Sequence, residues 1–365
     1  MLAAGGTGGH LFPAYALAEE LGRRNIAVDL VTDMRGDRYG TGFPARKVYR
    51  IPSATFAGRS PLAAAWTAVT LARGIRAAAK LLGTVKPKVV VGFGGYPSFP
   101  PLMAARLKRI PTALHEQNAV LGRANRMLVK RVSAVATSFE ATKLLEGAAL
   151  AKSCFTGNPV RDQVIDWAER PYRPCEGDDR FRLLVFGGSQ GARFFSETVP
   201  KAVQLLPAAL RQRLHVIQQC RPEDQAQVLA GYKSAAGSLG IEAEVAPFFK
   251  NLPELMASSH LVIARAGASS VAELTVMGRP SILVPLPHAL DNDQLQNATR
   301  LAESGACWCI EQKALTPARL AQEISRLMSE PVTLVAAAEA AKRQGRPDAV
   351  HRLADLVESL MGRRR

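Results

Sequence analysis

Short apolar runs and amphipathic stretches alternate along the chain, a pattern typical of strands that are each followed by a helix. Residues 261–264 form an apolar run of strand length, and the small residues 266–270 interrupt it. Apolar positions at helical spacing follow as far as Gly278, where a glycine and a nearby proline form a stop signal. Ser269 or Ser270 is the predicted N-cap of this helix.

The same stretch is the strongest candidate for a ligand site. A helix start presents free N–H groups and the positive end of the helix dipole, so an anion can bind there without a dedicated cation. Glu273 lies one turn into the helix, where a carboxylate either binds a ribose diol or only complements the dipole. An apolar run at 281–284 then leads to a loop and helix start crowded with hydrogen-bonding side chains: Asp291, Asn292, Asp293, Gln294 and Asn297. This crowding favours a hydroxyl-rich ligand.

The chain opens with the same order of elements. Residues 1–4 are apolar, a glycine-rich loop runs from Gly5 to His10, and an amphipathic helix follows. Residues 182–186 repeat the pattern, entering the glycine turn 187–192 and a further helix. Such turns let main-chain N–H groups approach a phosphate closely. The first strand is shorter than the usual length of about five or six residues, so we expect that the natural start lies upstream or that the chain is trimmed.

Two more predicted strands end in polar or glycine-rich loops. Residues 89–91 run into 92–98, and 113–114 run into 115–118. Because ligands of open α/β folds bind where the carboxyl ends of parallel strands meet, this repetition predicts two nucleotide-binding halves of one α/β architecture. The glycine loops do not match G-x-G-x-x-G, which excludes the dinucleotide fingerprint.

The length of 365 residues exceeds one ordinary core, so two domains are expected. Residues 158–161 end the first domain, and the stretch 170–180, rich in proline, glycine and charge, is typical of a linker. We therefore predict domains at 1–160 and 161–340, followed by a C-terminal helix in 341–365.

The charge balance predicts an acidic partner. Lys and Arg number 47 against 31 Asp and Glu, a net charge of +16. No zinc finger, basic helix–turn–helix or aromatic-studded basic strand appears, so nucleic acid ranks below a membrane surface. The stretch 60–82 is either an ordinary amphipathic helix or, as we prefer because basic residues recur at 106–109, a face that meets an anionic bilayer. That face carries Trp66, Val69, Arg73, Arg76 and Lys80.

Several classes of protein are excluded. Five cysteines form neither a disulfide ladder nor a zinc pattern, and no window approaches the roughly 20 apolar residues of a membrane span. The given sequence does not open with a basic segment followed by an apolar one, so we expect no signal peptide, and with this cysteine pattern we expect a reduced, cytosolic chain. Metallohydrolase, serine hydrolase and P-loop motifs are missing. His10, at the end of the first glycine loop, is either an acid–base group near neutral pKa or a residue that caps the loop.

Six motifs in order give the chain a family resemblance: G-G-T-G-G-H, G-F-G-G-Y-P-S, H-E-Q-N, G-N-P-V-R, G-G-S-Q-G-A and A-G-A-S-S-V-A-E. Together they resemble the MurG family, which transfers GlcNAc from UDP-GlcNAc to undecaprenyl-diphospho-muramoyl-pentapeptide (lipid I) in bacterial peptidoglycan synthesis. The resemblance implies a GT-B fold, with two Rossmann-like domains whose parallel sheets face across a cleft. It also implies that the C-terminal helix packs back toward the first domain.

The resemblance implies a set of substrate contacts. UDP-GlcNAc contacts would come from Thr7, Gly8, Gly9, Asn118, Arg161, Ser189, Phe249, Ala268, Ser269, Ser270, Val271, Ala272, Glu273 and Gln294. Lipid I would meet Gly5, Gly6, Gly94, Gly95 and Tyr96, and the apolar and basic face around residues 66–80 would seat its polyprenyl chain. Asp293 departs from members that carry a second glutamine before Gln294, which leaves the sugar contacts there open.

The implied reaction is an attack by the 4-hydroxyl of MurNAc on the anomeric carbon, with inversion to a β-1,4 link and loss of UDP. His10 is the candidate general base, and helix dipoles with Arg161 would offset the diphosphate charge, so no metal or cofactor is expected. The implied location is peripheral, at the cytoplasmic face of the inner membrane. Alternatives are a UDP-GlcNAc 2-epimerase, another lipid-acceptor glycosyltransferase and, least favoured, a sugar-nucleotide sensor.

Overall fold

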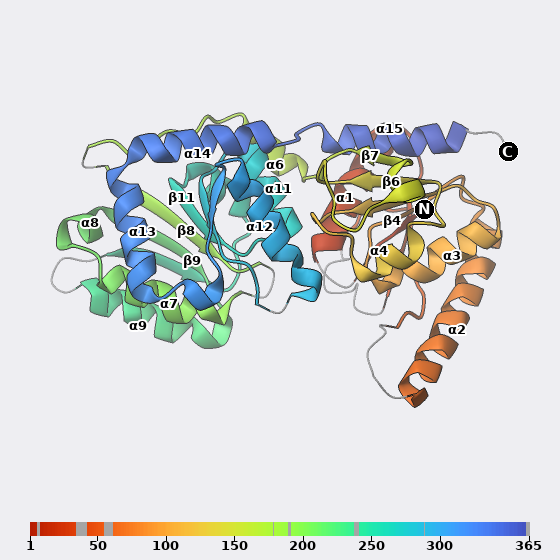
Figure 1. Ribbon diagram of the computed structural model, residues 1–365, viewed down its shortest axis with the longest axis horizontal. Helices are drawn as coiled ribbons and strands as arrows, with labels where there is room; N and C mark the ends of the chain where they lie inside the picture. The colour runs from red at the N-terminus through yellow and green to blue at the C-terminus, as the bar shows by residue number, and fades with distance from the viewer. Residues whose placement is uncertain are drawn as a thin grey trace. The chain divides into compact units, whose positions relative to one another are not determined.

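The computed structural model describes residues 1–5, 8–33, 42–54, 61–177, 179–188, 191–236, 241–287 and 289–362. The chain divides into two compact units (Figure 1). Unit 1 comprises Met1–Arg161 and Arg346–Arg365, and unit 2 comprises Asp162–Gly345. Both units contain one parallel sheet covered by helices on each face, so the predicted α/β class with two parallel-sheet domains is confirmed.

Unit 1 is built on a seven-stranded sheet in the order β3-β2-β1-β4-β5-β6-β7. Its elements are β1 (Leu2–Ala3), α1 (Gly8–Arg23), β2 (Asp29–Thr32), β3 (Lys47–Arg50), α2 (Pro61–Val85), β4 (Val90–Gly92), η2 (Tyr96–Ser98), α3 (Phe99–Leu107), β5 (Thr112–Glu116), α4 (Arg123–Leu128), β6 (Ala134–Thr137), α5 (Gly147–Leu150), β7 (Ser153–Phe155) and α15 (Ala349–Gly362). The chain order changes direction between β1 and β4, the position where open α/β sheets bind ligands.

Successive strand residues of unit 1 point to opposite faces, and both faces are buried. Val91 packs with α1 and α15 on one face, whereas Val90 packs with α2, α3 and α4 on the other. Strands buried on both sides read as continuous apolar runs, which is why residues 89–91 carry no polar alternation. The core of unit 1 is therefore a three-layer sandwich of helices, sheet and helices.

Unit 2 has a six-stranded sheet in the order β10-β9-β8-β11-β12-β13. Its elements are α6 (Asp162–Ala168), β8 (Phe181–Phe186), α7 (Arg193–Gln204), α8 (Ala208–Arg213), β9 (Leu214–Gln219), η3 (Pro222–Asp224), α9 (Gln225–Ala236), β10 (Glu242–Ala246), α10 (Leu252–Ser258), β11 (Leu261–Ala264), α11 (Ala268–Met277), β12 (Ser281–Leu283), η4 (Leu290–Asn292), α12 (Asp293–Glu303), β13 (Cys307–Cys309), η5 (Gln312–Ala314), α13 (Pro317–Ser329) and α14 (Pro331–Gln344). Helices α7 and α9 lie side by side below the sheet in Figure 1, and α11 and α14 lie above it.

The linker-like stretch 170–180 is anchored to unit 2. The buried guanidinium of Arg279 donates to the carbonyl of Arg170 at 2.8 Å and stacks over the ring of Tyr172. Tyr172 in turn donates its hydroxyl to the carbonyl of His260 at 3.0 Å. These contacts fix the segment to the end of α11 and to the start of β11.

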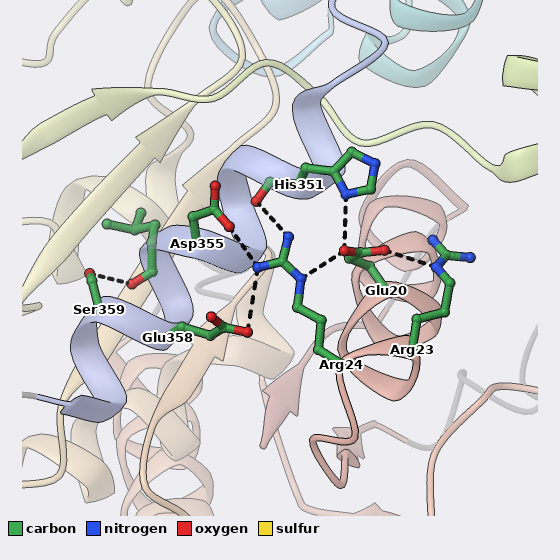
Figure 2. Close-up of polar contacts among 8 residues, drawn as sticks. Glu20, Arg23, Arg24, His351, Asp355, Glu358 and Ser359 are labelled. Carbon is green, nitrogen blue, oxygen red and sulfur yellow. Dashed lines mark hydrogen bonds and ion pairs between the residues drawn. The ribbon is translucent and has the colours of Figure 1, made fainter.

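Helix α15, at the end of the chain, packs on α1 in unit 1 and is held there by charged side chains (Figure 2). The buried carboxylate of Glu20 lies 2.7 Å from Arg24 Nε and 2.9 Å from His351 Nδ1. Arg24 also reaches Asp355 at 2.6 Å and Glu358 at 3.4 Å. Burial acts to raise the pKa of Glu20, but its hydrogen bonds to Arg24, Arg23 and His351 lower it from 4.5 to about 2. We call Glu20, Arg24, His351 and Asp355 the α1–α15 latch.

Candidate functional site

The carboxyl edge of the sheet in unit 1 brings two glycine loops next to His10. Gly94 and Gly95 have φ angles of 81° and 66°, which favour glycine. A Cβ atom on Gly95 would lie 3.2 Å from His10 Cδ2 and 3.4 Å from Nε2, and one on Gly94 would lie 3.5 Å from His10 Cε1. A Cβ on Gly5, after β1, would lie 2.8 Å from Thr32 Oγ1. These glycines therefore let the main chain approach the imidazole and the end of β2 closely.

His10 lies in the first turn of α1, and its Nδ1 is 3.2 Å from Gln117 Oε1. Burial lowers the pKa of His10, while hydrogen bonds to the Gln117 side chain and the Phe93 main chain act in the opposite direction. The imidazole is therefore neutral at neutral pH, the form that a general base requires. The ring of His10 lies against the Gly94–Gly95 turn. Of the two alternatives for His10, this position and the neutral imidazole favour the acid–base group over a residue that only caps the loop.

Glu116 organises the loop that follows β5. Its buried carboxylate accepts from the main-chain N–H groups of Asn118 and Gly122, both at 2.9 Å. It also accepts from the side chain of Asn118 at 3.3 Å and from that of Asn125 at 2.6 Å. Burial raises the pKa of Glu116, and these four donors counteract it. The predicted contact residue Asn118 is thus held half-buried at the carboxyl edge of unit 1.

The other predicted residues of unit 1 lie around the same edge. Gly8 and Gly9 begin α1, and Tyr96 begins the short helix η2 directly after the Gly94–Gly95 turn. Arg161 stacks its guanidinium over the ring of Phe12, 4.8 Å from the centroid, which places this cation on α1. Gly6 and Thr7 lie outside the described residues, as does Ser189 of unit 2.

In unit 2, helix α11 begins at Ala268 with Gly267 as its N-cap, so the prediction of Ser269 or Ser270 as N-cap was wrong. Gly267 has extended backbone and no side chain with which to bond the first turn. The first N–H groups of the helix therefore keep no side-chain cap. The predicted stop is confirmed, since Gly278 adopts the left-handed conformation at the C-cap.

The first turns of α11 have the features of an anion site. Ser269 Oγ is buried and has no hydrogen-bond partner among the described residues. A Cβ atom on Gly267 would meet no described heavy atom within 4 Å, so this part of the structure leaves room beside the turn. Glu273 is buried one turn further along, and Val271 faces the core, whereas Ala268, Ser270 and Ala272 are half-buried. Uncapped N–H groups, a free hydroxyl and a nearby carboxylate suit a phosphate and an adjoining diol.

Arg265 is a functional candidate that the sequence analysis missed. Its buried guanidinium donates to the carbonyls of Val284 at 3.1 Å and Pro285 at 3.2 Å, and to Gln312 Oε1 at 2.6 Å. It also lies over the rings of Phe194 and Phe195 in α7. Burial lowers the pKa of Arg265 to about 10, so it stays charged at neutral pH. The sequence shows a cation directly after the apolar run 261–264, but it does not show the contacts of Arg265, because the contacting residues are distant in the chain.

The polar loop before α12 is held close to this turn. Gln294 accepts the N–H of Leu286 with its Oε1 at 3.0 Å, which leaves its amide Nε2 as a donor. The buried Asn297 donates to the carbonyl of Ala266 at 3.1 Å. Asp293 Oδ1 accepts the main-chain N–H of Gln294 at 2.7 Å, and burial raises the pKa of Asp293. Gln294 and Asn297 are thus brought to the same sheet edge as α11.

The glycine turn after β8 connects to the loop that carries Phe249. Gly188 and Gly191 have positive φ angles of 86° and 67°. Gln219, at the end of β9, accepts the N–H of Gly187 at 3.4 Å and donates to the carbonyl of Pro247 at 3.2 Å. Phe249 is buried two residues further on. The predicted unit 2 residues that the structure describes therefore all lie on loops or helix starts at the carboxyl edge of its sheet.

The predicted membrane face lies on one side of α2. Trp66 and Val69 are 69% and 48% exposed, large values for apolar residues, and Arg73, Arg76 and Lys80 are exposed as well. Their spacing of three and four residues aligns them in one stripe, which we call the α2 stripe. The opposite side of the helix packs on α3. The stripe is thus an unburied face whose N-terminal half is apolar and whose C-terminal half is basic.

No group of three His, Cys, Asp or Glu side chains in the described ranges could hold a metal ion. No helix in that part of the chain is both long enough and apolar enough to cross a bilayer.

Comparison with known proteins covers both units. The model of the glycosyltransferase family 28 N-terminal domain matches residues 1–137, and that of the C-terminal domain matches residues 182–353. A protein of Chelativorans sp. (strain BNC1) is 50% identical over 99% of this chain and 94% of its own length. Its name is UDP-N-acetylglucosamine–N-acetylmuramyl-(pentapeptide) pyrophosphoryl-undecaprenol N-acetylglucosamine transferase. A protein of the same name from Methylobacterium sp. (strain 4-46) is 53% identical over 98% of this chain and 95% of its own.

The chain belongs to the MurG family. A crystal structure of MurG from Acinetobacter baumannii matches with a TM-score of 0.79 and 28% identity, covering 98% of each chain. A UDP-GlcNAc 2-epimerase from Neisseria meningitidis matches with a TM-score of 0.68 over 98% of this chain and 99% of its own. Its identity of 14% shows only a shared fold, so the epimerase alternative is not favoured over MurG.

Proposed function

We propose that this protein transfers GlcNAc from UDP-GlcNAc to the 4-hydroxyl of MurNAc in lipid I, as a step of peptidoglycan synthesis on which cell shape and division depend. The observation that carries the proposal is 50% identity across 99% of the chain to a transferase named for this donor and acceptor. Because the match spans both units, it includes the edge with His10 and the edge with α11.

Unit 2 is the proposed donor domain. The uncapped start of α11 and Ser269 receive the diphosphate of UDP-GlcNAc, and Glu273 accepts the ribose hydroxyls. Gln294, with the buried Asn297 nearby, binds the GlcNAc hydroxyls, and the loop around Phe249 receives the uracil. Main-chain dipoles at the start of α11 offset the charge that develops on the leaving UDP, and Arg161, a residue of unit 1, is the proposed cation for the same charge. The proposal assigns neither a protein-bound metal nor a cofactor to the site.

Unit 1 is the proposed acceptor domain, with lipid I held at the glycine loops around Gly5 and Gly94–Tyr96. His10 removes the proton of the MurNAc 4-hydroxyl as its oxygen attacks the anomeric carbon of GlcNAc. The bond from that carbon to the diphosphate oxygen breaks, and UDP leaves with the electron pair. A single displacement on an α-linked donor inverts the centre and gives a β-1,4 disaccharide.

The test is UDP release from UDP-GlcNAc with and without a lipid I analogue. Release that depends on the muramoyl lipid and yields the β-1,4 disaccharide is the expected result. Release without that acceptor, or the appearance of ManNAc, would contradict the transferase assignment.

The α2 stripe supports a peripheral location at the cytoplasmic face of the inner membrane. Trp66 and Val69 suit the headgroup boundary, and the three cations suit anionic lipid, worth about 1 kcal/mol each near the surface. Reversing Arg73, Arg76 and Lys80 to Glu is expected to abolish binding to vesicles that contain phosphatidylglycerol. Reversing the exposed Lys201, Lys233 and Lys313 of unit 2 changes the net charge equally and serves as the control. Equal loss in both triple variants would show a net-charge effect and contradict a membrane role of α2.

A further inference from the structure

Gln117 is a buried amide whose hydrogen bonds join two histidines. It directly follows Glu116, the last residue of β5, and its side chain is only 1% exposed. The amide lies between Nδ1 of His10, at 3.2 Å from Oε1, and Nδ1 of His115, at 2.9 Å from Nε2. A neutral imidazole exists as two tautomers, and only the form with its proton on Nδ1 leaves Nε2 able to accept a proton.

The orientation of the amide follows from its main-chain contacts. Gln117 Nε2 lies 3.0 Å from the carbonyl oxygen of Phe93 and 3.2 Å from that of His115. A carbonyl oxygen can only accept, so the amide atom facing it must be the nitrogen. The other amide atom, which faces His10 Nδ1, is therefore the oxygen. Since this oxygen also only accepts, His10 must carry its proton on Nδ1.

His10, Gln117 and His115 form a chain of hydrogen bonds, which we call the relay. The contacts of His115, at the other end of this relay, require the same orientation of the Gln117 amide. His115 Nε2 lies 3.0 Å from the carbonyl oxygen of Gly157, so His115 carries its proton on Nε2 and leaves Nδ1 as the acceptor for Gln117. Burial lowers the pKa of His115 to about 4, so this ring stays neutral at neutral pH. Two carbonyl groups, one at each end, thus fix the direction of every hydrogen bond between them.

We propose that Gln117 is a positioning residue that holds His10 in the tautomer protonated on Nδ1. In this state the lone pair of His10 Nε2 lies on the side of the Gly94–Gly95 turn. During transfer, Nε2 takes the proton of the attacking hydroxyl, and Gln117 Oε1 stabilises the imidazolium through Nδ1–H. The catalytic part of this inference rests on the proposed function, whereas the tautomer does not.

The tautomer is tested on the full-length protein without substrate. Long-range ¹H–¹⁵N spectra of ¹⁵N-histidine-labelled protein distinguish protonation at Nδ1 from protonation at Nε2, and the signals missing in His10→Gln identify His10. We expect a single Nδ1–H form in the native protein and a mixture in Gln117→Met, whose side chain keeps the length but not the amide. An Nε2–H form in the native protein, or an unchanged form in Gln117→Met, would overturn the proposal.

The catalytic consequence is tested by kinetics on lipid I. Gln117→Met is expected to lower kcat about 10- to 100-fold, with the Kd for UDP-GlcNAc unchanged within about two-fold, because only the proton transfer is impaired. Thr112→Val is the matched control: it lies at the other end of β5, is buried, and loses one hydrogen bond with Ser133. An equal fall in kcat in both variants would show that general damage to β5, not the tautomer, is responsible.

The variant Gln117→Glu distinguishes a role of Gln117 in positioning His10 from a role in the local fold alone. A carboxylate at position 117 still accepts from His10 Nδ1 and raises the pKa of His10, because a nearby negative charge favours the imidazolium. The same carboxylate faces Nδ1 of His115, so both rings gain a negative neighbour. The acid limb of the kcat–pH profile is therefore expected to move to higher pH in Gln117→Glu, by about one unit or more. An unmoved limb would contradict the relay. If the native protein has the Nδ1–H tautomer but transfers no GlcNAc to lipid I, the result would count against the proposed function and not against the tautomer.

Discussion

The two units present their sheet edges with different chemistry. At the edge of unit 1, buried side chains bond to one another: His10, Gln117 and His115 form a chain, and Glu116 holds the next loop. At the edge of unit 2, α11 starts without a side-chain cap, and the turn 266–268 before and at its start contains only alanine and glycine, so it offers main-chain groups. Unit 1 is thus suited to control a proton, and unit 2 is suited to bind an anion.

This difference matches what the two proposed substrates require. A proton must be removed by one nitrogen of defined tautomer and pKa, which needs fixed side-chain partners. A diphosphate carries charge spread over several oxygens, so N–H groups at a helix start bind it without a titratable group. Changes in unit 1 are therefore expected to alter the rate and its pH dependence, and changes in unit 2 to alter donor affinity.

The largest effect is expected at His10. His10→Ala removes the base and should lower kcat about 10²- to 10⁴-fold, the usual contribution of general acid–base catalysis. The Kd for UDP-GlcNAc, measured by calorimetry, should stay within about two-fold. Equal losses in turnover and donor affinity would show that His10 serves binding, and the division between the units would fail.

The next effect concerns Glu273 in unit 2. Glu273→Ala should weaken UDP binding about 10- to 100-fold, since a charge-assisted hydrogen bond to the ribose contributes about 1.5–3 kcal/mol. The loss should be much smaller for 2′-deoxy-UDP, which lacks one of the two hydroxyls. If both nucleotides lose affinity equally, Glu273 stabilises the helix and does not contact the ribose.

The α1–α15 latch is expected to affect stability and not chemistry, although α1 also carries His10. The pKa of Glu20 is depressed from 4.5 to about 2 in the folded protein, so its contribution is complete above pH 4.5 and is lost as the pH falls toward 2. Glu20→Gln should therefore lower unfolding free energy by about 1–3 kcal/mol at pH 7. The difference from the native protein should shrink below pH 4.5, as urea unfolding at both pH values would report. A difference independent of pH would contradict the charged latch.

The smallest effect is expected at Ser269. Its hydroxyl has no described partner in the free protein, so Ser269→Ala should leave the melting temperature unchanged or slightly raised. The same change should weaken UDP-GlcNAc binding about 2- to 10-fold, the value of one hydrogen bond. A fall in the melting temperature with unchanged affinity would assign Ser269 to the helix and not to the donor.

Local sequence patterns predicted which strand ends and turns form the site, but not the hydrogen bonds between its side chains. The apolar runs and glycine turns located the strand ends, because each is a contiguous segment whose period or φ angle is set by its own residues. The stop at Gly278 was predictable for the same reason. The N-cap was not: serine is the stronger cap by propensity, but the chain enters α11 one residue after extended Gly267.

The contacts missed by sequence reasoning are long-range. His10 and Gln117 are 107 residues apart, and Glu20 and His351 are 331 residues apart. No periodicity links such pairs, since the sheet order and the return of α15 bring them together. Arg265 belongs to the same class, because its partners lie directly after β12, on η5 and on α7. Residue types indicated which side chains carry chemistry, and only the fold showed how they are paired.

The most direct test of this division is a double-mutant cycle on kcat/KM for UDP-GlcNAc at saturating lipid I, with His10→Ala, Glu273→Ala and the double variant. If one residue serves proton transfer and the other donor binding, the two losses in free energy should add within about 0.5 kcal/mol. A double variant no worse than His10→Ala alone would show that the two residues act as one unit. That result would contradict the assignment of separate roles to the two sheet edges.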